Sequence, residues 1–64
     1  MVVYKIQNRI NGKVYIGATV GNLVYRWRVH LFHARSGKCS PLWDDIRKYG
    51  EDQFYIQALM TVNT

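Results

Sequence analysis

The amino-acid sequence predicts one small α+β domain with the element order β-β-α-α-β. Residues 2–7 and 13–18 are rich in β-branched and aromatic residues and flank an Asn-Gly turn, which is typical of a hairpin. Two segments with helix start and stop signals follow. Residues 53–60 then alternate between apolar and polar side chains, as in a strand with one face on a core. A chain of 64 residues forms one domain only, here residues 1–64.

Pairing within the hairpin decides whether its two tyrosines meet. We expect Gln7 to lie opposite Gly12, which places Tyr4 directly across from Tyr15. A slip of one residue would send the two phenols to opposite faces of the sheet. Gly17 lies near the end of the second strand, where a missing side chain lets another group approach closely.

The first helix is predicted to begin after Asn22, a good N-cap, and to run to about Ser36, with Gly37 as its stop. Apolar residues recur at the spacing of one buried stripe: Leu23, Trp27, Leu31 and Ala34. A neighbouring face of the same helix carries three polar residues: Arg26, His30 and His33.

The second helix has the clearest local signals. Ser40 is its cap, Pro41 takes the first turn, and Gly50 follows its end. Asp44 and Asp45 complement the positive end of the helix dipole. Its buried stripe is predicted to consist of three residues: Leu42, Ile46 and Tyr49.

Charge is distributed unevenly along the chain. Residues 1–43 hold seven of the nine basic residues and no acid, whereas all four acids lie within residues 44–52. A region of one sign suits a polyanion, because phosphates attract clustered Lys and Arg. The alternative is a solvated basic surface. The candidate nucleic-acid-binding residues are Lys5, Lys13, Arg26, Arg28, Arg35 and Lys38.

Several protein classes are excluded by composition. No apolar run approaches the ~20 residues that span a bilayer, and the N-terminus lacks the pattern of a secretion signal. The single Cys39 forms no internal disulfide and has no second Cys for a zinc pair. A reducing, cytoplasmic setting is the default expectation.

The motifs, in their order, resemble the GIY-YIG endonuclease family, especially its phage and homing-type members. Residues 11–17 read Asn-Gly-Lys-Val-Tyr-Ile-Gly, Arg26-Trp27 and His30 follow, and residues 45–50 read Asp-Ile-Arg-Lys-Tyr-Gly. The first signature is degenerate, with Val2-Val3-Tyr4 in place of Gly-Ile-Tyr. The resemblance covers nearly the whole chain.

The resemblance implies a small three-stranded antiparallel sheet flanked by helices, and cleavage of DNA phosphodiester bonds with one divalent metal. Tyr4 and Tyr15 match the signature tyrosines, Arg26 the arginine and His30 the histidine that often follows it, so these four are the candidate catalytic residues. In that scheme a tyrosine accepts the proton of the attacking water, directly or through another group, and the arginine steadies the phosphate. The residue types suit this chemistry, because hydrolysis builds negative charge on phosphoryl oxygens.

One family feature has no counterpart. The family's metal-binding glutamate lies on a helix after the third strand, whereas Glu51, the only Glu here, precedes that strand. We therefore assign no metal ligand and expect a domain that is incomplete at its C-terminus. Mg²⁺ or another divalent metal is expected only if the protein is active, and cleavage by this form is in doubt. The alternative is an inactive, phage-like scaffold that binds or inhibits a protein or nucleotide target.

Structural explanations stand beside the catalytic ones. Tyr4 and Tyr15 also suit strand residues that pack across a hairpin, and Arg26 also suits phosphate binding without catalysis. His30 is as well suited to orienting a neighbour as to transferring a proton. Both tryptophans are better explained as core anchors than as base-stacking platforms: Trp27 and Trp43.

An apolar row on the third strand is expected to stay uncovered, because no further helix follows it. Two rows are candidates: Phe54, Ile56, Ala58 and Met60, or Tyr55 and Leu59. Exposed apolar patches and open strand edges favour association, so the sequence predicts a homodimer.

Overall fold

A computed structural model describes residues 1–63 of the chain. Its elements run in the order β-β-α-α-β, which confirms the predicted α+β class. The elements are β1 (Val2–Asn8), β2 (Val14–Thr19), α1 (Leu23–Arg35), α2 (Pro41–Tyr49), a short 3₁₀ turn η1 (Glu51–Gln53) and β3 (Phe54–Thr61). No helix within residues 1–63 has the length and apolar character needed to cross a membrane.

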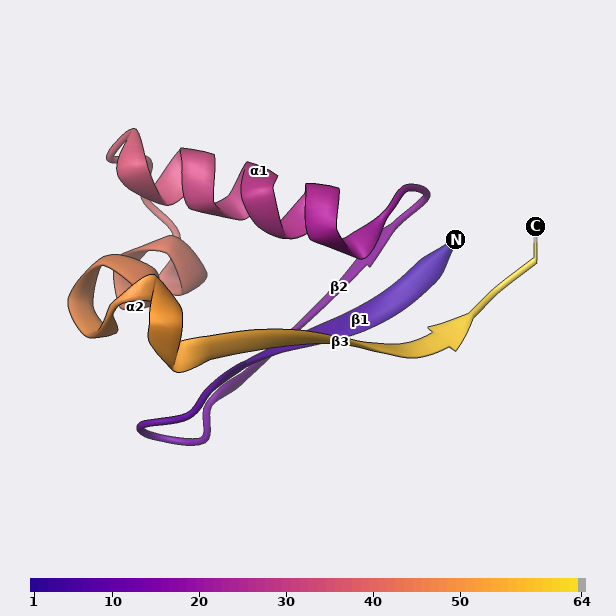
Figure 1. The fold of residues 1–64 in the computed structure, drawn as a ribbon, viewed down its shortest axis with the longest axis horizontal. Helices are drawn as coiled ribbons and strands as arrows, with labels where there is room; N and C mark the ends of the chain where they lie inside the picture. The colour runs from indigo at the N-terminus through magenta and orange to yellow at the C-terminus, as the bar shows by residue number, and fades with distance from the viewer. Residues whose placement is uncertain (64) are drawn as a thin grey trace.

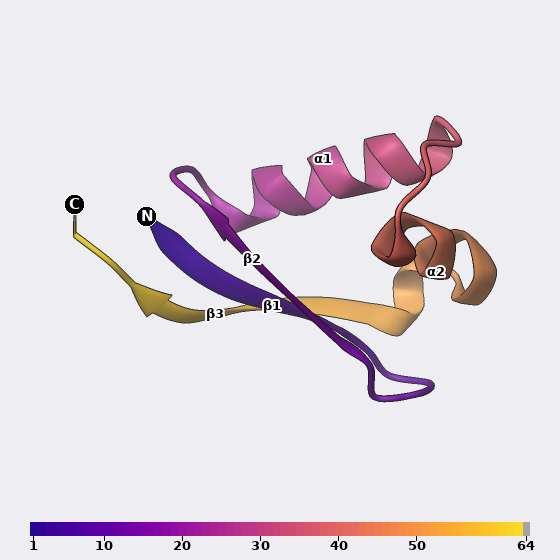
Figure 2. The same ribbon diagram turned by 180° about the vertical axis from the view of Figure 1, so that it is seen from behind.

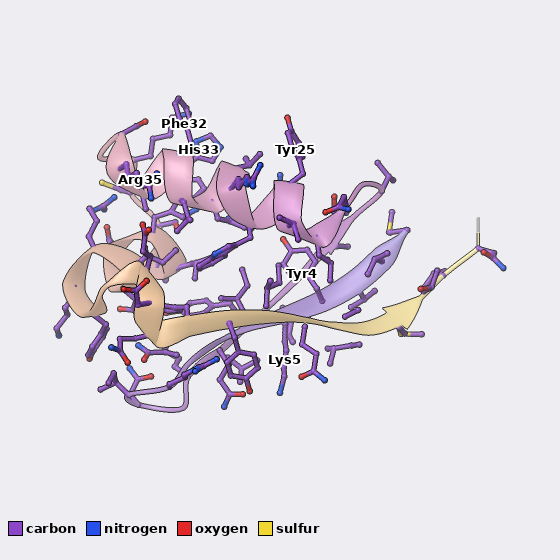
Figure 3. All side chains as sticks on the ribbon, viewed as in Figure 1. Tyr4, Lys5, Tyr25, Phe32, His33 and Arg35 are labelled. Atoms are coloured by element: carbon purple, nitrogen blue, oxygen red, sulfur yellow. The ribbon has the colours of Figure 1, made fainter. Side chains whose placement is uncertain are left out.

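The three strands form one antiparallel sheet with the order β2-β1-β3, so β1 is central. Both helices lie on the same side of this sheet (Figures 1 and 2). The core lies between the helices and the sheet and consists of buried residues from the sheet and from both helices: Tyr4, Ile6, Ala34, Leu42, Ile46 and Phe54. Lys5 points away from Tyr4, toward the face that carries no helix (Figure 3).

The predicted hairpin register is wrong by two residues. Tyr4 pairs with Gly17, and Tyr15 pairs with Ile6. Because side chains alternate with a period of two, this shift leaves both tyrosines on the helix-covered face. The two phenols are therefore diagonal neighbours along the sheet and do not face each other directly.

Two asparagine side chains account for the register. Asn8 Oδ1 accepts a hydrogen bond from the backbone N–H of Ile10 at 2.8 Å, and Asn11 Oδ1 accepts from that of Lys13 at 2.9 Å. These local bonds stabilise a longer loop, closed by the Asn8 N–H and the Lys13 carbonyl at 2.9 Å. Gly12, with φ of 75°, lies inside this loop and is not paired with Gln7.

The helix boundaries agree with the capping signals. Asn22 Oδ1 accepts from two backbone N–H groups at the start of α1, at 2.7 and 3.2 Å. Ser40 Oγ accepts from the Trp43 N–H at 3.1 Å, and Gly50 follows α2 with φ of 94°. Of the two acids predicted to complement the dipole of α2, only Asp44 lies in its first turn.

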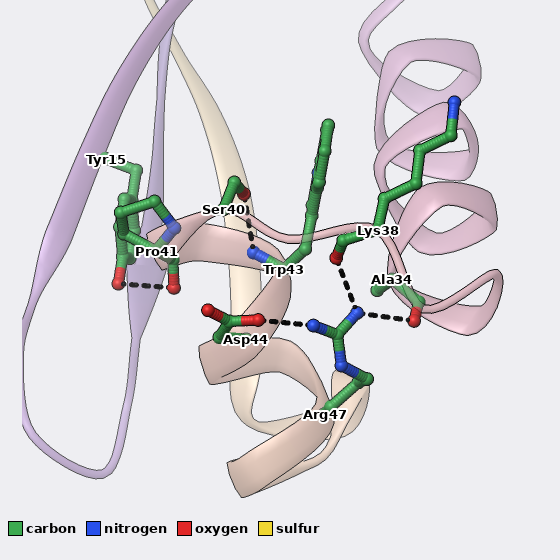
Figure 4. Close-up of polar contacts among 8 residues, drawn as sticks. All are labelled: Tyr15, Ala34, Lys38, Ser40, Pro41, Trp43, Asp44 and Arg47. Atoms are coloured by element: carbon green, nitrogen blue, oxygen red, sulfur yellow. Dashed lines mark hydrogen bonds and ion pairs between the residues drawn. The ribbon is translucent and has the colours of Figure 1, made fainter.

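Arg47 fastens α2 to the end of α1 (Figure 4). Its Nη1 donates to the carbonyl oxygens of Ala34, at 2.8 Å, and of Lys38, at 2.9 Å. Its Nη2 makes a short ion pair with Asp44. Carbonyls at a helix C-terminus lack partners within the helix, so the guanidinium satisfies one that would otherwise be open. This contact fixes the position of α2, and with it that of Trp43.

The third strand is covered along only part of its length. Phe54 is buried and Ile56 is half-buried, but Ala58 and Met60 are exposed. Leu59, which has no partner on β1 because the register shifts there, is also exposed. An apolar uncovered stretch is thus present, but it is the second half of β3 and not a complete row of either face.

Candidate functional site

The Tyr4 hydroxyl lies at the centre of a polar cluster between β1 and α1. His30 Nε2 is 3.0 Å from Tyr4 Oη, and Arg26 Nε donates to the same oxygen at 3.4 Å. Tyr4 and His30 are only 3% and 9% exposed, whereas Arg26 is half-buried. Three of the four predicted catalytic residues are thus in contact, although Arg26 and His30 lie 22 and 26 residues from Tyr4.

Gly17 provides the space for the Tyr4 ring. A Cβ atom built on Gly17 would lie 2.5 Å from Tyr4 Oη and 2.6 Å from its Cζ, closer than real Cβ contacts come. The close approach expected at Gly17 is therefore made by Tyr4 itself, its partner in the β1–β2 ladder.

His30 is held on both ring nitrogens. Trp43 Nε1 donates to His30 Nδ1 at 3.1 Å, opposite the Tyr4 contact at Nε2. Burial, together with the positive charge of Arg26 and the nearby His33, lowers the pKa of His30 from 6.5 to about 4. His30 is therefore neutral at pH 7. Trp43 packs against the core as predicted, but its bond to His30 was not anticipated.

Tyr15, the fourth predicted catalytic residue, has different partners. Its hydroxyl donates to the Asp45 carboxylate through a short hydrogen bond. The same hydroxyl lies 3.4 Å from the Pro41 carbonyl oxygen, the contact drawn in Figure 4. Burial, followed by the hydrogen bond and negative charge of Asp45, raises the pKa of Tyr15 to about 12. Tyr15 thus joins the hairpin to α2, and Asp45 is a site neighbour that sequence reasoning had treated as a dipole partner.

The predicted nucleic-acid-binding residues are spread over several surfaces. Lys5 lies on the open face of the sheet, where its Nζ donates to Gln7 at 3.2 Å and lies 5.6 Å from the centre of the Tyr55 ring. Lys13 Nζ is 3.9 Å from the Asp45 carboxylate. Of the six predicted nucleic-acid-binding residues, Arg26 alone forms a hydrogen bond with Tyr4 or His30 within residues 1–63.

On α1 and the loop that follows, the basic residues differ in their pairing. Arg35 Nη2 contacts both carboxylate oxygens of Glu51 at 2.8 Å. Arg28 and Lys38 are exposed, and neither forms an ion pair within residues 1–63. Arg28 and Lys38 are therefore the better candidates for a surface contact with phosphates, and Arg35 is partly neutralised.

The acidic residues do not form a metal site with one another. Three of the four already have cationic or phenolic partners: Asp44 with Arg47, Asp45 with Tyr15 and Lys13, and Glu51 with Arg35. In the described part of the chain, no three His, Cys, Asp or Glu side chains gather closely enough to hold an ion. Three of the carboxylates are therefore engaged by other side chains, and within residues 1–63 none of the four is hydrogen-bonded to Tyr4, Arg26 or His30.

The cluster is reached from the surface. Residues 1–63 enclose no pocket, so a ligand would meet the site at the half-buried Arg26 and not inside a cleft. A planar guanidinium with a phenolic oxygen behind it is suited to one small anionic group with several oxygens.

Comparison with known proteins identifies the family of the chain. Residues 1–61 match the family model of the GIY-YIG catalytic domain. Neither the curated proteins nor the solved structures compared with the chain gave a match. The family match covers the hairpin, both helices and β3, and therefore every residue of the cluster. The chain belongs to the GIY-YIG family.

Proposed function

We propose that Tyr4, Arg26 and His30 form a site for a DNA phosphodiester in a nuclease-type domain. The observation that carries this proposal is the bond from Arg26 Nε to Tyr4 Oη at 3.4 Å. It uses one edge of the guanidinium, and within residues 1–63 no other hydrogen bond occupies the Arg26 side chain. The two terminal nitrogens then remain for bidentate contact with phosphate oxygens.

The proposed roles differ among the cluster residues. Arg26 stabilises the negative charge that grows on the phosphoryl oxygens during hydrolysis. In the proposed step the phenolate of Tyr4, formed when the hydroxyl releases its own proton to solvent, accepts a proton from the attacking water. The Nε–H of Arg26 faces this charged oxygen, and His30 Nε2 lies 3.0 Å from it. Tyr15 supports the hairpin and takes no part in proton transfer, because its high pKa and its bond to Asp45 keep it protonated.

We further propose that residues 1–64 alone cleave DNA weakly or not at all. The family resemblance implies a divalent metal, yet three of the four acids within residues 1–63 are paired elsewhere, and none of the four bonds to the Tyr4 cluster. A carboxylate from another segment or from a second copy would have to complete the site. A plasmid-nicking assay with Mg²⁺ tests this, and efficient cutting that Arg26→Ala abolishes would overturn it.

Binding is tested separately from cleavage. Fluorescence anisotropy with a short labelled DNA duplex should show weak affinity that falls steeply with salt and depends little on sequence. Arg26→Ala should weaken binding about tenfold, since a charged hydrogen-bonded contact contributes about 1.5–3 kcal/mol. Lys48→Ala is the matched control, because Lys48 is exposed on α2 and its Nζ lies over the Tyr49 ring. Equal losses for both variants would contradict a localised phosphate site.

A second candidate function is a non-enzymatic binding or inhibitor protein with a protein target. It is favoured by the outer side of α1, where Tyr25 and Phe32 are 68% and 64% exposed and point away from the sheet (Figure 3). Exposed aromatic residues of this size are typical of protein contacts. If the wild-type chain shows no DNA binding even at low salt, this second function is the better one.

A further inference from the structure

We propose that Trp43 is a positioning residue, whose indole N–H fixes the direction of the hydrogen bond between His30 and Tyr4. This inference rests on the proposed function for its catalytic meaning, but its structural part can be tested without DNA. It is carried by a chain of two contacts: Trp43 Nε1 to His30 Nδ1 at 3.1 Å, and His30 Nε2 to Tyr4 Oη at 3.0 Å.

The direction follows from the chemistry of the indole. A tryptophan N–H donates and has no lone pair to accept with. The contact at Nδ1 is therefore a hydrogen bond only if Nδ1 carries no hydrogen. A neutral imidazole must then carry its hydrogen on Nε2. His30 consequently donates to Tyr4 Oη, and the phenol oxygen is the acceptor.

The other tautomer would reverse the roles of the two side chains. With the hydrogen on Nδ1, Nε2 would accept from the Tyr4 hydroxyl, and His30 would be placed to take up its proton. The indole N–H and the Nδ1–H would then face each other across 3.1 Å, leaving two donors without a partner. Trp43 thus makes Tyr4 Oη, and not His30 Nε2, the hydrogen-bond acceptor of this pair.

Protonation of His30 is also disfavoured by the indole N–H of Trp43, because the imidazolium carries hydrogen on both nitrogens. The groups around the ring reinforce it: Tyr4 from β1, Arg26 and His33 from α1, and Trp43 from α2. Within residues 1–63 no carboxylate is bonded to the ring to compensate. The low pKa of His30 agrees with this arrangement.

The contact between Trp43 and His30 depends on the packing of α2 against α1, which the sequence alone does not predict. Trp43 lies 13 residues from His30 and reaches it because Arg47, one turn later on α2, holds that helix against the Ala34 carbonyl. His33 also packs against the indole, with ring centres 4.8 Å apart. The indole is therefore held in place by two residues of α1, His30 and His33.

The direct test is nitrogen-15 NMR of the imidazole rings in the free protein at pH 7. The expected spectrum of His30 shows a protonated Nε2 and a hydrogen-bonded, unprotonated Nδ1. A through-bond coupling between the indole N–H of Trp43 and His30 Nδ1 provides a measurement that needs no variant. A His30 ring protonated on Nδ1, or charged at pH 7, overturns the proposal.

A variant series tests the causal role of the indole N–H. Trp43→Phe keeps an aromatic ring but removes the donor, so the Nδ1–H form should become detectable. The protonation equilibrium of His30 should also shift by about tenfold, raising its pKa by about one unit. Trp27→Phe is the control, because Trp27 packs on Phe54 at 6.4 Å between ring centres and is not bonded to His30. An unchanged tautomer and pKa in Trp43→Phe overturns the proposal.

The NMR test of Trp43 and the DNA-binding test of the proposed function can fail independently of each other. If the NMR results are as expected but DNA does not bind, the positioning role stands and the phosphate site fails. If DNA binds through Arg26 but the His30 tautomer is the other one, only the role of Trp43 is lost.

Discussion

The side chain of Tyr4 occupies the space that any side chain at Gly17 would need. The two residues are paired in the central ladder of the hairpin, and a Cβ on Gly17 would come within 2.5 Å of the phenol oxygen. The phenol, its strand partner and the helix α1 are therefore mutually dependent, because the same oxygen receives the contacts from Arg26 and His30.

Substituting Gly17→Ala should displace the Tyr4 ring and weaken DNA binding. Forcing a methyl group into a packed site costs about 1–3 kcal/mol of unfolding free energy, which urea denaturation measures. Gly21→Ala is the control, since its added Cβ would lie 3.9 Å from the nearest atom, Thr19 Oγ1. The control should change stability by less than about 0.5 kcal/mol. Equal behaviour of the two variants would contradict the close packing.

Substituting Tyr15→Phe should lower stability and leave DNA affinity nearly unchanged. The variant loses the hydrogen bond to Asp45, with a cost of about 1–2 kcal/mol. Urea denaturation and anisotropy with labelled DNA measure the two effects. A loss of DNA affinity as large as that of Arg26→Ala, at unchanged stability, would place Tyr15 in the phosphate site instead.

The fall in the free energy of unfolding at high pH should also depend on Tyr15. Its folded-state pKa of about 12 lies above the ordinary value of 10.0, so its contribution is complete below pH 10 and is lost as the pH rises toward 12. Urea midpoints measured across this range should fall more steeply for the wild type than for Tyr15→Phe. Parallel curves would show that Tyr15 titrates normally.

On the acid side, His30 should make the protein less stable as the pH falls. Its folded-state pKa of about 4 lies below the ordinary 6.5, so the unfolded chain binds the proton first. The stabilisation is complete above pH 6.5 and is lost as the pH falls toward 4. His30→Asn should remove this part of the pH dependence, whereas His33→Asn should retain it. Urea midpoints at pH 7 and 4.5 measure the difference.

The ion pair between Arg35 and Glu51 should lower the affinity for DNA and contribute little to the stability of the fold. Both side chains are largely exposed, at 67% and 41%, so the pair contributes at most about 1 kcal/mol. Glu51→Gln should tighten DNA binding at low salt, because it removes a negative charge beside a basic helix. Asp52→Asn, an exposed neighbour outside the pair, is the matched control. The same gain in both variants would indicate a general charge effect.

Self-association, predicted from the uncovered end of β3, is open to direct measurement. Leu59 and Met60 are 49% and 56% exposed on an edge strand. Light scattering at rising concentration should show a dimer in the wild type and a monomer in Leu59→Lys/Met60→Lys. A monomeric mass at high concentration would remove the homodimer from consideration.

The elements were predictable because their signals are local. Asn22, Ser40 and the glycines that follow each helix act on backbone groups within a few residues, so the helix limits could be placed from the sequence. The hairpin register was not predicted, because Asn8 and Asn11 form side-chain bonds that compete with a tight turn.

The cluster was predictable in part. Tyr4, Arg26 and His30 could be named from their residue types and motif spacing. Their partners could not, since Trp43 and Asp45 reach the site only once α2 has docked against α1 and the hairpin. Such contacts depend on the angle between elements, which short-range patterns do not encode.

The central position of β1 has a consequence for motion. Its amides bond to β2 on one flank and to β3 on the other, so complete release of β1 requires both ladders to open, whereas each outer strand can open alone. The phenol of Tyr4 thus stands on the slowest-opening backbone of the sheet. The guanidinium of Arg26 ends a long, partly exposed side chain. We therefore expect the Arg26 side chain to move when a phosphate binds.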